Sequence, residues 1–244
     1  MAEPFASNSV RNLMQLKRSL FFVVLCTFGF FAKRAIAAED LQSVLSRIDA
    51  ASANFHTTSA DVEFTSAQTK PVPDTDVQKG TVYYKRDGSS YQMGVHIDSD
   101  DGQAAPKVIV CCINGEIKLY DKLQDQVTTL SKLSQYESWF MLGFGAGSKE
   151  LAAKWDIVYG GPETVDGVKA EKLELTPKDP NVKAKLPKVI LWMDADRAIS
   201  LKQYFDEGGG QSRTCHYTNI KVNRSLPKDA FTLATDKKTT FVNR

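Results

Sequence analysis

The sequence predicts a mainly β protein with a few helices, built as a curled antiparallel sheet of about ten strands. Residues Gly80 to Val95 form two strands around a tight turn at Asp87-Gly88, and one face of both strands is apolar. Similar short segments follow at meander spacing, whereas helical patterns occur only at the start and in the middle. A sheet of this size curls or splits, and few residues remain for a second sheet. We therefore expect an open half-barrel covered by the helices.

A secretory signal is predicted at the N-terminus, over residues 1–37. Arg11, Lys17 and Arg18 are basic, Ser19 to Ala32 are apolar, and Ala35-Ile36-Ala37 has the small-x-small pattern of a cleavage site. The apolar run is shorter than the ~20 residues of a comfortable membrane span. The alternative is a signal anchor that stays attached.

Removal of residues 1–37 leaves 207 residues, enough for one domain, which we place at residues 38–236. Residues 237–244 are predicted to be a frayed tail. The leader contains five basic residues and one acidic residue, so the formal net charge falls from +2 to −2 without it. This charge does not favour a nucleic-acid partner, which would need a basic stripe.

The first half of the domain begins with a helix over Ala38 to Asn54, whose apolar residues recur at helical spacing. A strand over Ser59 to Ala67 alternates between apolar and polar residues. Turn-forming and polar residues predict loops at Thr69 to Asp76 and at Asp98 to Pro106, on either side of the Gly80 hairpin.

Three short strands come next, over Val108 to Ile113, Glu116 to Tyr120 and Gln126 to Leu130. Asn114-Gly115 between the first two is a strong hairpin signal. Asp121 to Asp125 forms the following turn.

The second half starts with a densely apolar helical pattern over Leu133 to Phe144, after which Ser148 can cap a short helix through Trp155. Five further strands are separated by turn signals. They are predicted at Asp156 to Tyr159, Val168 to Thr176, Lys188 to Asp194, Ala198 to Phe205 and Gln211 to Val222.

Three cysteines remain after the leader, so at least one is unpaired in a monomer. Cys111 and Cys112 are adjacent in a predicted strand and are expected to face opposite sides of the sheet. Cys215 can then pair with one of them across the sheet. The alternative is that all three are small buried hydrophobic residues.

The sequence gives little support to an enzyme. His56, His96 and His216 have no partner at metal-ligand spacing. Cys215 and His216 are strand neighbours that face opposite ways, so they cannot form an activated thiol pair. Asp98 to Gly102 resembles a calcium loop, but the glutamate at its twelfth position is missing. We expect no catalytic residue, no metal and no cofactor.

The positive signal is a surplus of apolar side chains, which suits a cavity for flexible acyl chains. For any single residue, the alternative is ordinary core packing. The expected cavity residues are Val62, Phe64, Val82, Tyr84, Tyr91, Met93, Val95, Leu119, Trp139, Phe140, Met141, Ile190 and Trp192.

Several of these segments, in their order along the chain, resemble the LolA family of periplasmic lipoprotein carriers. The family has an amphipathic helix ending in phenylalanine, a G-x-L-x-V-K-R-P strand followed by F-x-W, a D-G-K-x-L-W-x-Y-D hairpin, a P-F-M-L segment and an L-x-L-T-P-K strand. The corresponding segments here are Leu41 to Phe55, Gly80 to Asp87 with Tyr91 to Met93, Asn114 to Asp121, Trp139 to Leu142, and Leu173 to Lys178.

The resemblance implies helices that form a lid over an apolar cavity in the half-barrel. It implies that Arg86 hydrogen-bonds lid backbone and holds the empty form closed, although Arg86 alone would indicate a solvated strand end. The implied function is a monomeric periplasmic carrier for the acyl chains of lipoproteins or a similar lipid. Its implied partners are an inner-membrane release complex and an outer-membrane acceptor. The alternative function on the same fold is a periplasmic module that senses lipid or lipoprotein.

Overall fold

The structure is a computed structural model that describes residues 41–88, 90–113, 116–130 and 142–243. Residues 44–244 belong to one compact unit. The predicted signal peptide, residues 1–37, lies outside the described residues, and so does most of the apolar helix predicted at Leu133 to Phe144. No described helix combines the length and apolar character required to cross a membrane.

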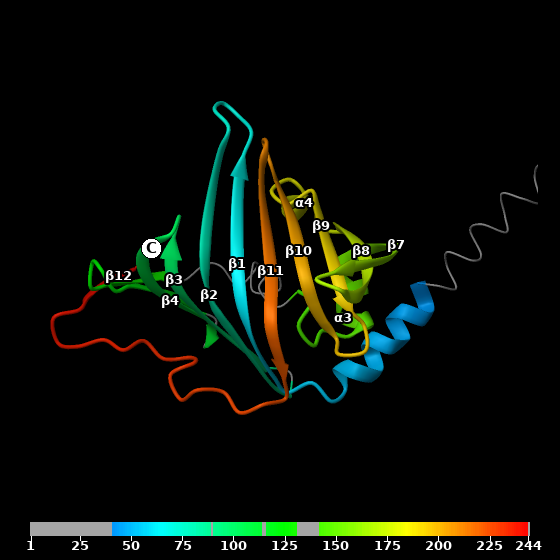
Figure 1. Cartoon of the computed structure of the whole chain (residues 1–244), viewed down its shortest axis with the longest axis horizontal. Coiled ribbons are helices and arrows are strands. Elements are labelled where there is room, and N and C mark those ends of the chain that lie inside the picture. The colour runs from blue at the N-terminus through cyan, green and yellow to red at the C-terminus, as the bar shows by residue number, and fades with distance from the viewer. Residues whose placement is uncertain (1–40, 89, 114–115, 131–141, 244) are drawn as a thin grey trace, which may run out of the picture. The chain divides into compact units, whose positions relative to one another are not determined.

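A single open sheet of twelve strands dominates the described residues (Figure 1). Along the sheet the strand order is β12-β6-β5-β4-β3-β2-β1-β11-β10-β9-β8-β7. The strands are β1 Thr57–Gln68, β2 Asp74–Asp87, β3 Ser90–Asp100, β4 Gln103–Ile113, β5 Glu116–Asp121, β6 Gln126–Leu130, β7 Trp155–Val165, β8 Val168–Pro177, β9 Lys188–Asp194, β10 Ile199–Gly208, β11 Gln211–Val222 and β12 Thr240–Asn243.

The sheet consists of two antiparallel meanders joined at its centre. Strands β1 to β6 form one meander and β7 to β11 form the other, and β1 pairs with β11 from Thr58↔Val222 to Gln68↔Gln211. The prediction of a mainly β protein with one open sheet is confirmed, and the sheet is antiparallel except for the pairing of β12 with β6. The arrangement is consistent with an open half-barrel, with twelve strands in place of about ten.

The hairpins of the first meander are longer than predicted. The expected loop at residues 69–76 is shortened, because β2 already begins at Asp74, and the expected loop at 98–106 lies largely in strands, because β3 ends at Asp100 and β4 begins at Gln103. The turn between β3 and β4 contains Asp101 and Gly102, both with positive φ angles of 46° and 77°. These strand ends were not predicted because their side chains are polar and most of them lie outside the hydrophobic core.

The C-terminal tail is also ordered as a strand, so the prediction of a frayed tail was wrong for Thr240–Asn243. This segment is β12, which pairs in parallel with β6. The backbone N–H of Thr240 donates to the carbonyl of Asp125 over 3.0 Å, and the hydroxyl of Thr239 donates to Asp125 Oδ1 over 2.8 Å. The edge of β6 supplies the pairing, which the tail sequence alone does not reveal.

The N-terminal helix covers residues 41–52, and Val44 and Ile48 are buried. Arg47 of this helix forms an ion pair with Glu171 of β8, whose side chain is almost completely buried. Burial raises the pKa of Glu171, but hydrogen bonds from Tyr159, Arg47 and Lys169 outweigh it and lower the pKa overall. The carboxylate therefore stays charged and fixes the helix to the sheet.

Two short helices lie in the described part of the second half. Helix α3, Ser148–Lys154, confirms the predicted helix, but Gly147 is its N-cap and Ser148 is already helical. Asp49 of the N-terminal helix accepts hydrogen bonds from the backbone N–H and the hydroxyl of Ser148, both at 2.6 Å. Helix α4, Pro180–Lys183, was not predicted, although Asp179 caps it and proline follows, which is a known start signal.

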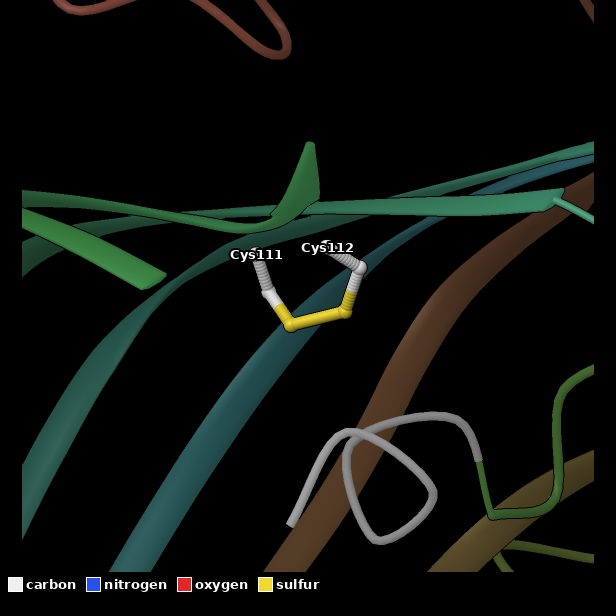
Figure 2. The surroundings of a disulfide bond; sticks show 2 residues. All are labelled: Cys111 and Cys112. Carbon is white, nitrogen blue, oxygen red and sulfur yellow. A yellow bond between two sulfur atoms is a disulfide. The ribbon is translucent and has the colours of Figure 1, made fainter. Parts of the chain in front are cut away.

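Cys111 and Cys112 form a disulfide, and Cys215 is a free, buried cysteine. Figure 2 shows the two side chains leaving the strand on the same side. The expectation that they face opposite sides was wrong, as was the pairing of Cys215 with one of them. The β4–β5 register shifts between Cys111 and Ile113, and Cys112 has a φ of 73°. This bulge interrupts the alternation that a regular strand would impose.

Alkylation should report this pairing. Without residues 1–37, the unreduced protein in denaturant is expected to take up one iodoacetamide group, at Cys215, and the reduced protein three. The native protein should resist labelling, because burial raises the pKa of the Cys215 thiol to about 12 and leaves little thiolate. Mass spectrometry of tryptic peptides checks each count. A label on Cys111 or Cys112 before reduction would contradict the disulfide.

Candidate functional site

One face of the sheet carries a cavity of about 480 Å³. Ile109 of β4 and Phe205 of β10 both line it, although these strands are five positions apart in the sheet, or about 24 Å if the sheet were flat. This face is therefore curved, and we call it the inner face. The lining residues are Phe64, Ser66, Gln78, Tyr84, Met93, Val95, Ile97, Ile109, Leu186, Gln203, Phe205, Glu207, Arg213, Cys215 and Tyr217.

Phe144 packs beside the cavity on the inner face. Its ring stacks on Tyr84 at a centroid distance of 3.9 Å and meets Tyr217 edge-on at 5.0 Å. Its backbone bridges to Ile199 of β10, so Phe144 does not continue the predicted helix. Gly145 must be small here, because its φ is 69° and a Cβ would lie 2.2 Å from the Phe55 ring.

At the end of the cavity beside Phe144, buried polar side chains form hydrogen bonds that lead to the backbone of Leu142. The hydroxyl of Tyr217 donates to Gln203 Oε1 over 3.0 Å, and Gln203 Nε2 donates to the Leu142 carbonyl over 2.5 Å. Burial raises the pKa of Tyr84 and of Tyr217, so both phenols stay neutral. These groups can anchor the segment at Leu142 without placing a charge inside the cavity.

Arg86 stands at the same end of the sheet and also holds this segment. Its Nη1 donates to the Gly145 carbonyl over 2.7 Å, and its Nε donates to the Gly88 carbonyl over 3.1 Å. The guanidinium lies 5.3 Å from the centre of the Tyr91 ring. Tyr91 in turn donates its hydroxyl to the carboxylate of Glu150 in α3. Burial and the Glu150 charge raise the pKa of Tyr91 to about 12, so it remains a donor.

The opposite end of the cavity is polar, and we call Ser66, Gln78, Glu207 and Arg213 the mouth. They lie near the ends of β1, β2, β10 and β11, towards the turns that link β1 to β2 and β10 to β11 (Figure 1). Arg213 Nη2 and Glu207 Oε1 form an ion pair at 3.3 Å. Ser66 is the direct cross-strand partner of Arg213.

An acidic group lies next to the mouth. Asp76 is the cross-strand partner of Ser66, and carboxylate oxygens of Asp76, Asp100 and Asp101 lie within 4.8 Å of one another. The hydrogen bond between Asp76 and Asp100 raises the pKa of Asp76 and lowers that of Asp100. Asp100 Oδ2 also accepts from Gln78 Nε2 at 3.0 Å and pairs with Lys107. The mouth thus faces groups of both signs.

The structure brings four of the predicted cavity residues to the cavity wall: Phe64, Tyr84, Met93 and Val95. Val62 and Val82 are buried in the same hydrophobic cluster, and Tyr91 packs against it. Leu119 is half-buried and is the cross-strand partner of the lining residue Ile109. Trp139, Phe140 and Met141 lie outside the described residues.

Ile190 and Trp192 were wrongly placed in the cavity. In β9 the buried residues are Val189, Leu191 and Met193, and Leu191 pairs with the cavity residue Gln203. Ile190 and Trp192 therefore point to the outer face. There Trp192 donates its indole N–H to Glu163 over 2.6 Å.

Sequence reasoning missed the contribution of β10 and β11. Gln203, Phe205 and Glu207 alternate along β10, as Arg213, Cys215 and Tyr217 do along β11. Both strands were predicted, so their period of two was available as a signal. The charged members obscured it, because an inner face is expected to be apolar.

Known proteins include a relative of this sequence and structural neighbours of this fold. No protein-family model matches the chain. An uncharacterized protein from Methanocaldococcus jannaschii is 28% identical over 137 residues, which is 56% of this chain and 36% of that protein. The chain thus spans about a third of the length of this relative.

Solved structures give broader coverage at low identity. A crystal structure of an uncharacterized conserved protein from Thermus thermophilus shares the fold, with a TM-score of 0.52, 14% identity, and coverage of 84% of this chain and 99% of that one. MucB has a TM-score of 0.49 and 16% identity, and the match covers 80% of this chain and 63% of MucB. A LolA superfamily protein from Nitrosomonas europaea has a TM-score of 0.39 and 18% identity, with coverage of 79% and 97%.

Proposed function

We propose that this chain is a LolA-like periplasmic carrier that shields the acyl chains of a lipoprotein or a similar lipid during transit. The observation that carries the proposal is the 480 Å³ cavity on the inner face, whose wall is mostly hydrophobic. Pockets for small molecules have volumes of roughly 300–1,000 Å³ and are mainly apolar. Each acyl methylene that enters such a cavity contributes ~0.8 kcal/mol to binding.

The contacts of Arg86 support a carrier that can close and release. Arg86 and Gln203 donate to the carbonyls of Gly145 and Leu142, two backbone groups of the segment that follows residues 131–141. Displacing this segment would break both hydrogen bonds, so a bound chain would compete with the closed form. We assign Arg86 the role of a latch. A periplasmic location follows from the predicted signal at residues 1–37, and the loading and unloading partners are those of LolA-like carriers.

Lipid extraction and transfer test this function. The protein without residues 1–37, purified from the periplasm, is expected to release acyl lipids into organic solvent, as detected by mass spectrometry. When loaded with a fluorescent fatty acid, it should pass the probe to acceptor vesicles. Binding without any transfer would favour the alternative, a lipid-sensing module.

A pair of neighbouring substitutions separates cavity binding from surface binding. Ser66→Trp places an indole in the cavity, whereas Thr65→Trp places the same group on the outer face of β1. We expect Ser66→Trp to weaken probe binding at least tenfold and Thr65→Trp to leave it unchanged. Circular dichroism checks that both variants fold. Equal binding by both variants, or a wild-type protein that binds no acyl probe, would overturn the proposal.

A further inference from the structure

The mouth of the cavity contains charges of both signs. Arg213 and Glu207 line the cavity and pair with each other, and their side chains are 47% and 34% exposed. An ion pair whose only role is to link two neighbouring strands can lie on the outer face, as the pair between Lys79 and Glu63 does. The inner-face position puts this pair where the polar end of a bound amphiphile would emerge.

Arg213 keeps donor capacity for a ligand. A guanidinium has five N–H donors in a planar fork that suits phosphate, and the ion pair with Glu207 uses Nη2 at 3.3 Å. The hydroxyl of Ser66, the cross-strand partner of Arg213, is a second donor on the same face. Together they can hold one phosphate group at the mouth.

The charges around Arg213 decide which head group fits. A purely anionic head would take Arg213 and leave Glu207 unpaired, with Asp76 and Asp100 nearby to repel the ligand. A purely cationic head would leave Arg213 unpaired. A head with one phosphate and one ammonium group exchanges the single ion pair of the empty mouth for two ion pairs, and it leaves no charge uncompensated.

We propose that the mouth binds the zwitterionic head of an acylated lipid, with its phosphate on Arg213 and Ser66 and its ammonium on Glu207. This inference rests on the proposed function, because the acyl chain occupies the cavity. It adds selectivity for the head group. Phosphoethanolamine-type lipids bind in preference to anionic or uncharged lipids with the same acyl chain. The head lies at the end of the cavity opposite to Arg86, so recognition and the latch use different residues.

Three single-chain probes with the same palmitoyl chain test the choice: lysophosphatidylethanolamine, lysophosphatidic acid and monopalmitoylglycerol. Each displaces a fluorescent fatty acid from the protein without residues 1–37, below its micelle concentration. The zwitterionic probe is expected to bind about tenfold more tightly than either of the others. If no probe binds, the proposed carrier function fails. If all three bind equally, only the head-group inference fails.

Charge-removing variants assign the two contacts. Arg213→Gln should lower the affinity for both phosphate-bearing probes about tenfold and leave monopalmitoylglycerol unchanged. Glu207→Gln should reverse the preference, so that lysophosphatidic acid binds more tightly than the zwitterionic probe. Lys79→Gln and Glu63→Gln make the same charge changes on the outer face and should not alter the order. An order that Glu207→Gln leaves unchanged would overturn the assignment.

Discussion

Replacing Phe144 with alanine is expected to lower the free energy of unfolding by about 3–5 kcal/mol, the usual range for a buried aromatic residue. Phe144 is fully buried, stacks on Tyr84 and meets Tyr217 edge-on, so the truncation leaves a cavity and breaks two aromatic contacts. Urea denaturation of the protein without residues 1–37, monitored by tryptophan fluorescence, measures the change in the free energy of unfolding.

Phe241→Ala is the matched control, because this side chain is 64% exposed in β12. It should change the free energy of unfolding by less than about 0.5 kcal/mol, as substitutions at exposed sites usually do. If Phe144→Ala were as mild as Phe241→Ala, the packing of the 142–147 segment on the inner face would be incorrect.

Arg86→Leu is expected to trap cargo. The substitution removes the donor to the Gly145 carbonyl, which destabilises the closed, empty form and leaves the loaded form relatively favoured. A hydrogen bond to a charged group contributes roughly 1.5–3 kcal/mol, so transfer to acceptor vesicles should fall at least tenfold. The measurement is transfer of a fluorescent fatty acid from preloaded protein.

Lys85→Leu removes the same charge from the neighbouring position, whose side chain is exposed. This variant should transfer the probe at the wild-type rate. Equal release of cargo by Arg86→Leu and the wild type would show that Arg86 is not a latch.

The sequence predicted strands well where turn residues bracket an alternating segment. The bounds of β9 and β11 agree with the prediction, since Asp194 and the glycines before Gln211 mark their ends. It failed on which side of β9 is buried, because Val189 to Met193 are apolar at every position and show no period of two. A neighbouring strand, through the pairing of Leu191 with Gln203, decides the face.

Other features depend on partners that are distant in the sequence. The bulge at Cys112 and the pairing of β12 with β6 are set by neighbouring strands, so local pattern could not reveal them. Only the hydrophobic part of the candidate site could be predicted from the sequence, for a different reason. Hydrophobic wall residues such as Met93 follow the expected alternation, whereas Glu207 and Arg213 violate it by placing charge on the inner face. Such violations are expected at functional positions.

The central position of β1 has a consequence for how the chain folds. Its neighbour β11 begins at Gln211, far along the chain from the end of β1 at Gln68, so the middle of the sheet closes only when the last long strand arrives. Until then both meanders expose an unpaired backbone edge, a surface that invites pairing with other chains. Pairings between residues so far apart in sequence form slowly. A newly made chain would therefore pass through a vulnerable stage in which its two halves exist but the sheet that joins them does not.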